Sequence, residues 1–388
     1  MKKFGLALAM MTIAMVFGLV LAGCNNGTTG PVFDKEFNVS TIEAISAALE
    51  EIGSTPGEYL IRVNTNLLDY PGTTLWNDGV NITVRGTGSN QITWGDTEVV
   101  DGHVFQVHAG KLTLENITLT RGTGTSKDWW PIIWQDGGIV EIKNGVTITN
   151  NNENNYYPAI QLGGKNATFI ISGGIIKDSN RAIHTSSDEV SITMSGGTIK
   201  DCETGIYISG SGSSATISGG IIENCVNGVI LDGNGASISM SNGTIRNTTY
   251  HGIFLPPSSV NSTLNISGGT IENCENGIGV EGKGGSITIS GGIIRRTNYS
   301  SIGLWPDGAN YTINITGGEL SGDQKGITLE GNNGTVTISG GKIHGGEQFG
   351  VSVDSGSGHT VTKTGGTVTG GTAPYNVNNN ATAVVTGF

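Results

Sequence analysis

The chain has 388 residues, of which 64 are glycine and only 13% are charged, and its formal net charge is −12. An acidic chain with so few cations lacks the basic stripe that nucleic-acid binding requires, so no nucleic-acid partner is expected. The glycines recur at regular positions between isoleucine and valine, unlike those of a flexible linker. The composition therefore favours a regular fold.

Residues 1–24 read as a targeting segment outside the fold. A lysine pair precedes an apolar run, and small residues follow the run. Its end, Leu21-Ala22-Gly23-Cys24, resembles the bacterial lipobox. The resemblance implies that Cys24 becomes a lipidated N-terminus that anchors the protein to a membrane; plain secretion with an incidental cysteine is the alternative. Under the enterobacterial sorting rule, Asn25 in place of aspartate favours the outer membrane or the cell surface.

Residues 25–37 read as a tether, and residues 38–53 as a capping helix. Ser40-Thr41-Ile42-Glu43 forms a capping-box pattern, and apolar residues follow it at helical spacing. The rest of the chain reads as stacked strands, whose end leaves unpaired backbone groups that a helix can cover. We therefore expect this helix to close the N-terminal end of a single domain at residues 38–388.

One short phrase, Ser-Gly-Gly-Xaa-Ile or a close variant, recurs nine times in the regular region at residues 166–388. Its first residues lie 23 to 26 positions apart, at Ser172, Ser195, Ser218, Ser241, Ser267, Ser290, Thr316, Ser339 and Thr364. This period indicates a solenoid, in which each repeat is a coil that buries its apolar face against its neighbours. Looser versions at Arg85, Glu115 and Lys143 extend the coils through residues 54–165. The sequence predicts about twelve coils and a length on the order of 55 Å.

Each coil contains three short alternating segments, separated by glycine, asparagine and aspartate, with no room for a helix. Over most of residues 38–388 this pattern resembles the right-handed parallel β-helices of the pectin lyase-like superfamily. We therefore expect an all-β, right-handed parallel β-helix. Alternate apolar residues such as Val229 and Leu231 should fill its interior. The glycine pair should permit a tight bend with positive φ or a close approach of two backbones.

Stacked positions of the repeat predict the surroundings of particular side chains. Cys202, Cys225 and Cys274 share one column and are expected to be buried, reduced thiols, with a Cys202–Cys225 disulfide as the alternative. No histidine column lies beside them, so no zinc site is expected. A neighbouring column of acids and asparagines reads as a ladder of stacked turn side chains: Asp178, Asp201, Asn224, Asn247 and Asn273.

Aromatic side chains collect on one flank of the predicted solenoid, on the outer face of the third strand and in the turns beside it. Ring faces stack on the C–H faces of sugars, so this flank is expected to bind glycan. The alternative is that the rings pack under long turns or stack between coils. The candidate ligand-binding residues are Trp129, Trp130, Trp134, Tyr156, Tyr157, Tyr207, Tyr250, His251, Phe254, Tyr299 and Trp305.

The pectin lyase-like resemblance also implies polysaccharide lyases and glycoside hydrolases, whose signature residues do not carry over here. Only Asp101-Gly102-His103 and Glu141-Ile142-Lys143 come near such motifs. Asp178 and Asp201 are candidates for a lyase-like calcium site, with His184 as a candidate base. The same acids also read as turn caps. We therefore assign no catalytic residue and expect no metal or cofactor, with calcium as the alternative.

The sequence favours a surface-anchored, non-catalytic β-helix lipoprotein that binds a polysaccharide. A structural or adhesive spacer that contacts a surface protein is the first alternative. A polysaccharide lyase or glycoside hydrolase is the second. Regular coils with short turns argue against an enzyme, because active sites are usually built on longer, irregular loops.

Overall fold

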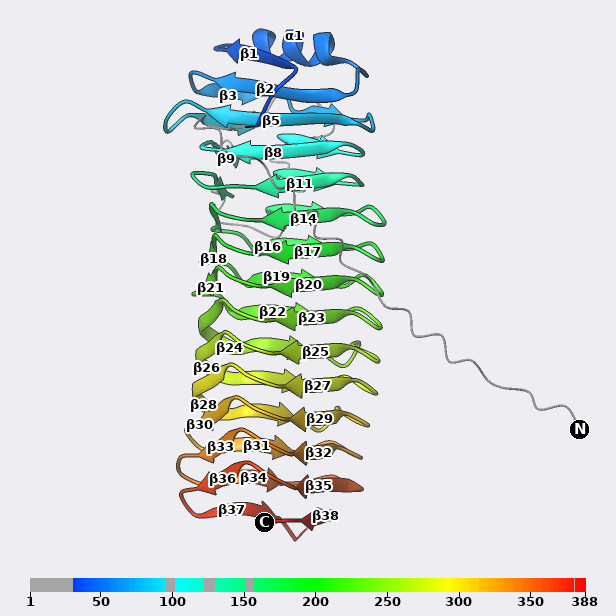
Figure 1. Cartoon of the computed structure of the whole chain (residues 1–388), viewed down its shortest axis with the longest axis vertical. Coiled ribbons are helices and arrows are strands. Elements are labelled where there is room, and N and C mark those ends of the chain that lie inside the picture. The colour runs from blue at the N-terminus through cyan, green and yellow to red at the C-terminus, as the bar shows by residue number, and fades with distance from the viewer. Residues whose placement is uncertain (1–30, 95–101, 122–129, 151–156, 380) are drawn as a thin grey trace, which may run out of the picture. The chain divides into compact units, whose positions relative to one another are not determined.

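The computed structural model describes residues 31–94, 102–121, 130–150, 157–379 and 381–388. Residues 33–388 form one compact unit. This unit is a parallel β-solenoid of about 14 turns, with one short helix near the N-terminus of the described chain (Figure 1). The predicted fold class is confirmed, and the solenoid is longer than the predicted twelve coils.

The first sheet has fifteen parallel strands, and each coil contributes one strand to it. Figure 1 shows these strands stacked in chain order. They are β1 (Lys35–Val39), β2 (Gly57–Val63), β5 (Val80–Gly86), β8 (Lys111–Glu115), β11 (Ile139–Ile142), β14 (Thr168–Ile171), β17 (Ser191–Met194), β20 (Ser214–Ile217), β23 (Ser237–Met240), β25 (Thr263–Ile266), β27 (Ser286–Ile289), β29 (Thr312–Ile315), β32 (Thr335–Ile338), β35 (His359–Lys363) and β38 (Ala383–Thr386).

The second sheet has 23 strands and contains the other two segments of each coil. The second segments are β3 (Leu67–Tyr70), β6 (Gln91–Trp94), β9 (Thr118–Arg121), β12 (Thr147–Thr149), β15 (Ile175–Lys177), β18 (Thr198–Lys200), β21 (Ile221–Glu223), β30 (Glu319–Gly322), β33 (Lys342–Gly345) and β36 (Thr367–Gly370).

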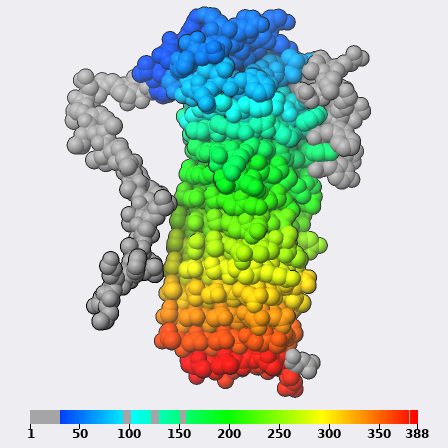
Figure 2. All heavy atoms as spheres, turned by 90° about the vertical axis from the view of Figure 1, so that its right-hand side faces the viewer, coloured from blue at the N-terminus to red at the C-terminus, as the bar shows by residue number. Residues whose placement is uncertain are grey.

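The third segments are β4 (Thr73–Leu75), β7 (Phe105–Val107), β10 (Ile133–Gln135), β13 (Ile160–Leu162), β16 (Arg181–Thr185), β19 (Thr204–Ile208), β22 (Asn227–Leu231), β31 (Lys325–Leu329), β34 (Phe349–Val353) and β37 (Ala373–Val377). In three coils the second and third segments merge into one long strand: β24 (Thr244–Leu255), β26 (Thr270–Val280) and β28 (Ile293–Leu304). The space-filling view shows the colours following one another from blue to red along the stack, so each coil lies between its neighbours in sequence (Figure 2).

The predicted capping helix is α1 (Ile42–Ile52). The Thr41 hydroxyl accepts a hydrogen bond from Ala44 N at 3.1 Å, and Gly53 N donates to Leu49 O at 3.0 Å where the helix ends. The helix buries Ile45, Ala48 and Ile52, as the periodicity predicts. β1 differs from prediction, because it begins within the expected tether and pairs with β2 in parallel. None of the described helices is long and apolar enough to span a membrane.

The two glycines of the repeated phrase serve different purposes. The second glycine has positive φ in each repeat, for example 75° at Gly197 and 79° at Gly220, a region that L-residues with a Cβ rarely adopt. The first glycine lies against the preceding coil: a Cβ on Gly219 would come within 2.2 Å of Ser195 O. Both predicted reasons for the glycine pair are therefore present, at different positions.

The interior and the cysteine column also follow the predicted register. The inward pairs are fully buried, as shown by Val229 and Leu231 at 0% exposure. The three cysteines are buried free thiols, and the alternative Cys202–Cys225 disulfide is absent. The Cys202 thiol donates instead to the Lys200 carbonyl at 3.1 Å, which satisfies a backbone group at the turn.

Replacing Gly219 by alanine tests the close approach of the coils. We expect G219A to lower the free energy of unfolding by roughly 1–3 kcal/mol, because the methyl group must displace the Ser195 carbonyl. The matched control is Ser218→Ala, an exposed site that should change stability by less than about 0.5 kcal/mol. Denaturant unfolding measures both values, and equal stability of the two variants would contradict this account of the glycine.

Candidate functional site

Trp76 is the most exposed large aromatic residue of the described chain, with 64% of its surface accessible. Its indole lies flat on the His108 imidazole, with ring centroids 3.7 Å apart and ring planes 9° apart. Trp76, His108 and Asp136 directly follow β4, β7 and β10, the third strands of three successive coils. The three residues lie in register, one above another, because His108 N and Asp136 N each donate to a carbonyl of the preceding coil at 2.8 Å.

Asp136 is the polar centre of this group. Its carboxylate accepts hydrogen bonds from the Trp134 indole N–H and from Gln106 Nε2 at 3.2 Å, and it lies 3.2 Å from His108 Nδ1. Trp134 is half-buried, and its ring lies over Gly163, where a Cβ would come within 3.1 Å of it. One carboxylate therefore holds two aromatic side chains and an amide in fixed orientations.

A hollow of about 290 Å³ opens beside the exposed indole. It is lined by Pro71, Gly72, Thr73, Thr74, Trp76, His103 and Gln106. His103 is buried, and its Nδ1 lies 2.9 Å from Pro131 O. Its ring packs against Trp130 and Trp134, with centroids 5.1 and 5.4 Å away. We call this hollow, with Trp76, His108 and Asp136, the Trp76 site.

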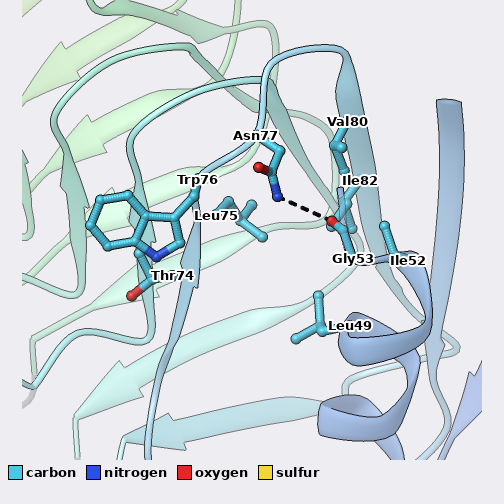
Figure 3. A pocket seen from close by; sticks show the side chains of 9 residues that line it. All are labelled: Leu49, Ile52, Gly53, Thr74, Leu75, Trp76, Asn77, Val80 and Ile82. Atoms are coloured by element: carbon cyan, nitrogen blue, oxygen red, sulfur yellow. Dashed lines mark hydrogen bonds between the residues drawn. The ribbon is translucent and has the colours of Figure 1, made fainter. Parts of the chain in front are cut away.

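The segment that carries Trp76 also contacts the capping helix. Figure 3 shows a small apolar pocket between the end of α1 and the segment that carries Trp76. Leu49 and Ile52 of the helix line this pocket together with Leu75, and Asn77 Nδ2 donates to Gly53 O at 3.2 Å. The cap of the solenoid thus also positions the exposed indole.

A second cluster lies on the outer face of the third strands in later coils, where His184 and Tyr207 are in register with Trp134. Tyr207 donates to Asp232 at 2.5 Å, the Arg181 guanidinium lies 4.0 Å above the tyrosine ring, and the His184 ring meets Tyr207 edge-on. His184 Nδ1 lies 2.9 Å from Gln161 Oε1. Burial and the nearby Arg181 lower the pKa of His184 to about 4, whereas burial and the bond to Asp232 raise the pKa of Tyr207 to about 12.

In the third cluster, aromatic rings fill spaces left by glycine. A Cβ on Gly279 would lie 2.7 Å from His251 Nδ1, and one on Gly303 would lie 2.5 Å from the Trp305 ring. Phe254 stacks on His251 at 4.6 Å, and the Tyr299 and Trp305 centroids are 5.5 Å apart. These rings pack on one another and on the backbone, as the packing alternative describes.

The ladder predicted at Asp178 and Asp201 is present. Asn224 donates to Asp201 at 3.2 Å, Asn247 to Asn224 at 3.3 Å, and Asn273 to Asn247 at 3.1 Å. All five ladder residues have φ between 53° and 56°, which asparagine and aspartate tolerate better than most residues. The candidate acids are therefore turn residues: Asp201 begins the bonded ladder, and Asp178 of the preceding coil accepts from Thr149 at 3.1 Å.

The reason for aspartate at two rungs is the charge beside them. Lys177 and Lys200 stack in adjacent coils, and each is paired with the aspartate that follows it, at 2.8 and 3.1 Å. In later coils the neighbouring column alternates in sign, with Glu223 bonded to Arg246 at 2.6 Å, and the ladder uses neutral asparagine. Although burial opposes it, hydrogen bonds from Asn224 and Lys200 hold the pKa of Asp201 below its ordinary value.

The remaining ligand-binding and lipidation candidates differ in whether the structure describes them and in how exposed they are. Trp129, Tyr156 and Cys24 lie outside the described residues, Tyr157 is half-buried, and Tyr250 is 52% exposed. No group of three or more metal-ligating side chains was found among the residues that were placed. Trp76, His108 and Asp136 are not among the site residues predicted from the sequence. The signal was available, because Trp76 follows its strand as Trp305 does, but the irregular spacing of the early coils obscured the alignment.

Residues 133–294 match a family model described as a right handed beta helix region. The match comprises less than half of the chain and agrees with the predicted fold and handedness. It begins after Trp76 and His108 and includes Asp136. A search of curated proteins and a search of solved structures gave no match. The comparisons therefore support the fold and leave function to be argued from the surface.

His184 and His251, two partly buried histidines, predict how stability depends on pH. Burial lowers the pKa of His251 to about 4, from an ordinary value of 6.5, and His184 behaves alike. Between these values the unfolded chain binds more protons, so stability should fall as pH decreases from about 6.5 to about 4. We expect His251→Phe to reduce this dependence. Denaturant midpoints measured across this pH range test it, and an unchanged slope would contradict the assignment.

Proposed function

We propose that the solenoid is a glycan-binding protein and that the Trp76 site is its principal contact with sugar. The observation that carries this proposal is the exposed indole of Trp76, held flat by His108 beside a hollow with polar walls. An aromatic face offers apolar area to the C–H face of a sugar ring, and adjacent polar groups fix the orientation of its hydroxyls. A rigid platform loses little conformational entropy when it binds.

The polar groups around the indole suit a neutral sugar. Thr74 Oγ1 lies 3.4 Å from Gln106 Oε1, and Gln106 Nε2 donates to Asp136, so the hollow offers both donors and acceptors. Asp136 is the only acid among the described residues of the site, and it already interacts with three side chains. Neutral hydroxyl groups can exchange hydrogen bonds with such a surface without leaving a buried charge unpaired.

Several observations favour binding over catalysis. A general base works best when its pKa lies near the operating pH, and the pKa values of about 4 for His184 and about 12 for Tyr207 lie far from neutrality. Asp178 and Asp201 are each paired with a lysine in the turn ladder. A lyase or hydrolase therefore remains the less supported alternative.

A spacer or adhesive that contacts a surface protein is the second candidate. The packing of Trp305 on Gly303 and of His251 on Gly279 favours it, because these rings stabilise the stack without any ligand. In this reading the solenoid extends a contact surface away from the membrane. The two roles are compatible if the Trp76 site binds glycan and the remaining coils provide length.

We further propose that the protein is attached to the bacterial envelope through lipid on Cys24. The lipobox-like sequence at residues 21–24 supports this proposal. Attachment of more than one acyl chain gives stable anchoring, because one chain alone binds a membrane only marginally. The outer membrane or cell surface is the proposed location.

Replacing Trp76 by alanine tests the glycan proposal. On an array of neutral and acidic polysaccharides, we expect W76A to weaken binding at least ~10-fold, equivalent to about 1.4 kcal/mol. The control is Tyr375→Ala, which removes a 44% exposed ring in the last coils. It should leave affinity unchanged. Equal binding by W76A and the parent protein would reject the Trp76 site, and release of unsaturated or reducing ends would favour an enzyme.

The membrane proposal is tested by Cys24→Ala in the chain of residues 1–388. We expect the variant to move from the membrane fraction to the soluble fraction, because no lipid can be attached without the thiol. Metabolic labelling with a fatty acid provides the second measurement. Continued partitioning into membranes by the variant would show that another segment holds the protein there.

A further inference from the structure

The first sheet carries a two-column array of small polar side chains on its outer surface. The array runs over eight consecutive strands, from β17 to β35, and we call it the hydroxyl face. One column contains Ser191, Ser214, Ser237, Thr263, Ser286, Thr312, Thr335 and Thr360. The other contains Thr193, Thr216, Ser239, Asn265, Thr288, Asn314, Thr337 and Thr362.

The hydroxyl face is a regular two-dimensional lattice. Each strand pairs with the next in parallel, and none of these seven pairings has a register shift. In contrast, the second sheet has shifts between β24 and β26 and between β26 and β28. Neighbouring strands lie ~4.8 Å apart, and alternate residues of a strand are ~6.6 Å apart. The polar groups therefore repeat at these two spacings over roughly 34 Å of the solenoid.

The face carries no charge and makes no competing bonds. All sixteen positions are serine, threonine or asparagine, and none of their side chains has a hydrogen bond to another described protein group. Towards the N-terminus the array ends at β14, where Ile170 occupies the second column. Two strands further on, Lys111 of β8 pairs with Glu141 of β11 at 2.7 Å. The charged columns of the same coils, such as Glu223 with Arg246, belong to the second sheet. Thr216, Ser239 and Asn265 are exposed and the other thirteen side chains are partly exposed, so these polar groups can contact a partner outside the face.

These properties restrict the partner. A charged ligand would find no counter-charge, and a sugar chain would find no ring to stack on. A neutral lattice of hydrogen-bonding groups with matching repeats is complementary, and hydroxyl groups can both donate and accept. At the surface of an ice crystal, water molecules form such a neutral lattice, with hydrogen-bond donors and acceptors that repeat in two directions. We propose that the hydroxyl face binds ice, a function separate from glycan binding at the Trp76 site.

Binding of this kind depends on many weak contacts formed together. Each hydroxyl gains little over its bond to liquid water, so several rows must fit the lattice at once. A bulky side chain in the middle of the array would hold the neighbouring rows away from the crystal. Loss of a single hydroxyl should have a much smaller effect.

The test uses residues 25–388, which include the whole solenoid. We expect the protein to shape growing ice crystals, produce thermal hysteresis and partition into a slowly frozen ice phase. Thr288→Tyr, in the middle of the array, should reduce the hysteresis at least ~5-fold, and Ser239→Tyr provides a second variant at an exposed row. The matched control is Thr249→Tyr, at an exposed threonine of the second sheet, which should retain full activity.

Circular dichroism and melting temperature establish that each variant is folded. Absence of hysteresis in the folded parent protein would overturn the proposal, as would equal losses in T288Y and T249Y. Retention on crystalline cellulose without any effect on ice would assign the face to an ordered polysaccharide, and dimerisation abolished by T288Y would assign it to a second copy. Because W76A should leave ice binding intact, failure here is distinguishable from failure of the glycan proposal.

Discussion

In-register stacking of equivalent positions in successive coils is the constraint on which the rest of the structure depends. Parallel pairing places each side chain directly over the corresponding side chain of the previous coil, about 4.8 Å away. Only residues that tolerate such a neighbour can occupy a column. Isoleucine fills the interior, asparagine bonds to asparagine in the turns, and glycine lies where the carbonyl of one coil approaches the backbone of the next.

Charged side chains are the hardest to stack in register, because like charges in one column repel each other. The solenoid resolves the problem in two ways. Glu223 and Arg246 alternate along the axis and bond to each other, whereas Lys177 and Lys200 are stacked and bond sideways to aspartates of the ladder. Exposed pairs of this kind contribute little to stability. They remove a repulsion that would otherwise oppose stacking, and they account for the acidic pair without catalysis.

The repeat made much of this arrangement predictable. Trp134 and Tyr207 lie on the outer face of the third strands, as the sequence predicts, and the cysteine column and the asparagine ladder also have the predicted register. The Trp76 site was not predictable by the same means, because residues 54–165 lack the Ser-Gly-Gly phrase and their coils vary in length. β1 was not predicted, because its five residues are too few to show a periodic pattern of polar and apolar side chains. It joins the sheet through backbone hydrogen bonds to β2.

The packing of the aromatic flank could also not be predicted from the sequence. The sequence places His251 and Trp305 on the outer surface, where they are, but it does not show that the glycines at positions 279 and 303 leave room for the rings to lie flat. A ring that fills such a space stabilises the coil, but one of its faces is covered by the backbone and cannot contact a sugar. Trp76 has no such space to fill, because the next coil offers His108 as a partner of similar size.

Stacking also determines where different kinds of binding can occur. A site for a discrete ligand needs unlike groups close together, such as an indole, a carboxylate and an amide, and identical coils cannot supply them. Trp76, His108 and Asp136 meet in the coils that depart most from the repeat. The regular coils can present only repeating surfaces, and a repeating surface selects a partner that is itself periodic. The irregular N-terminal coils and the hydroxyl face are therefore suited to different partners for the same structural reason.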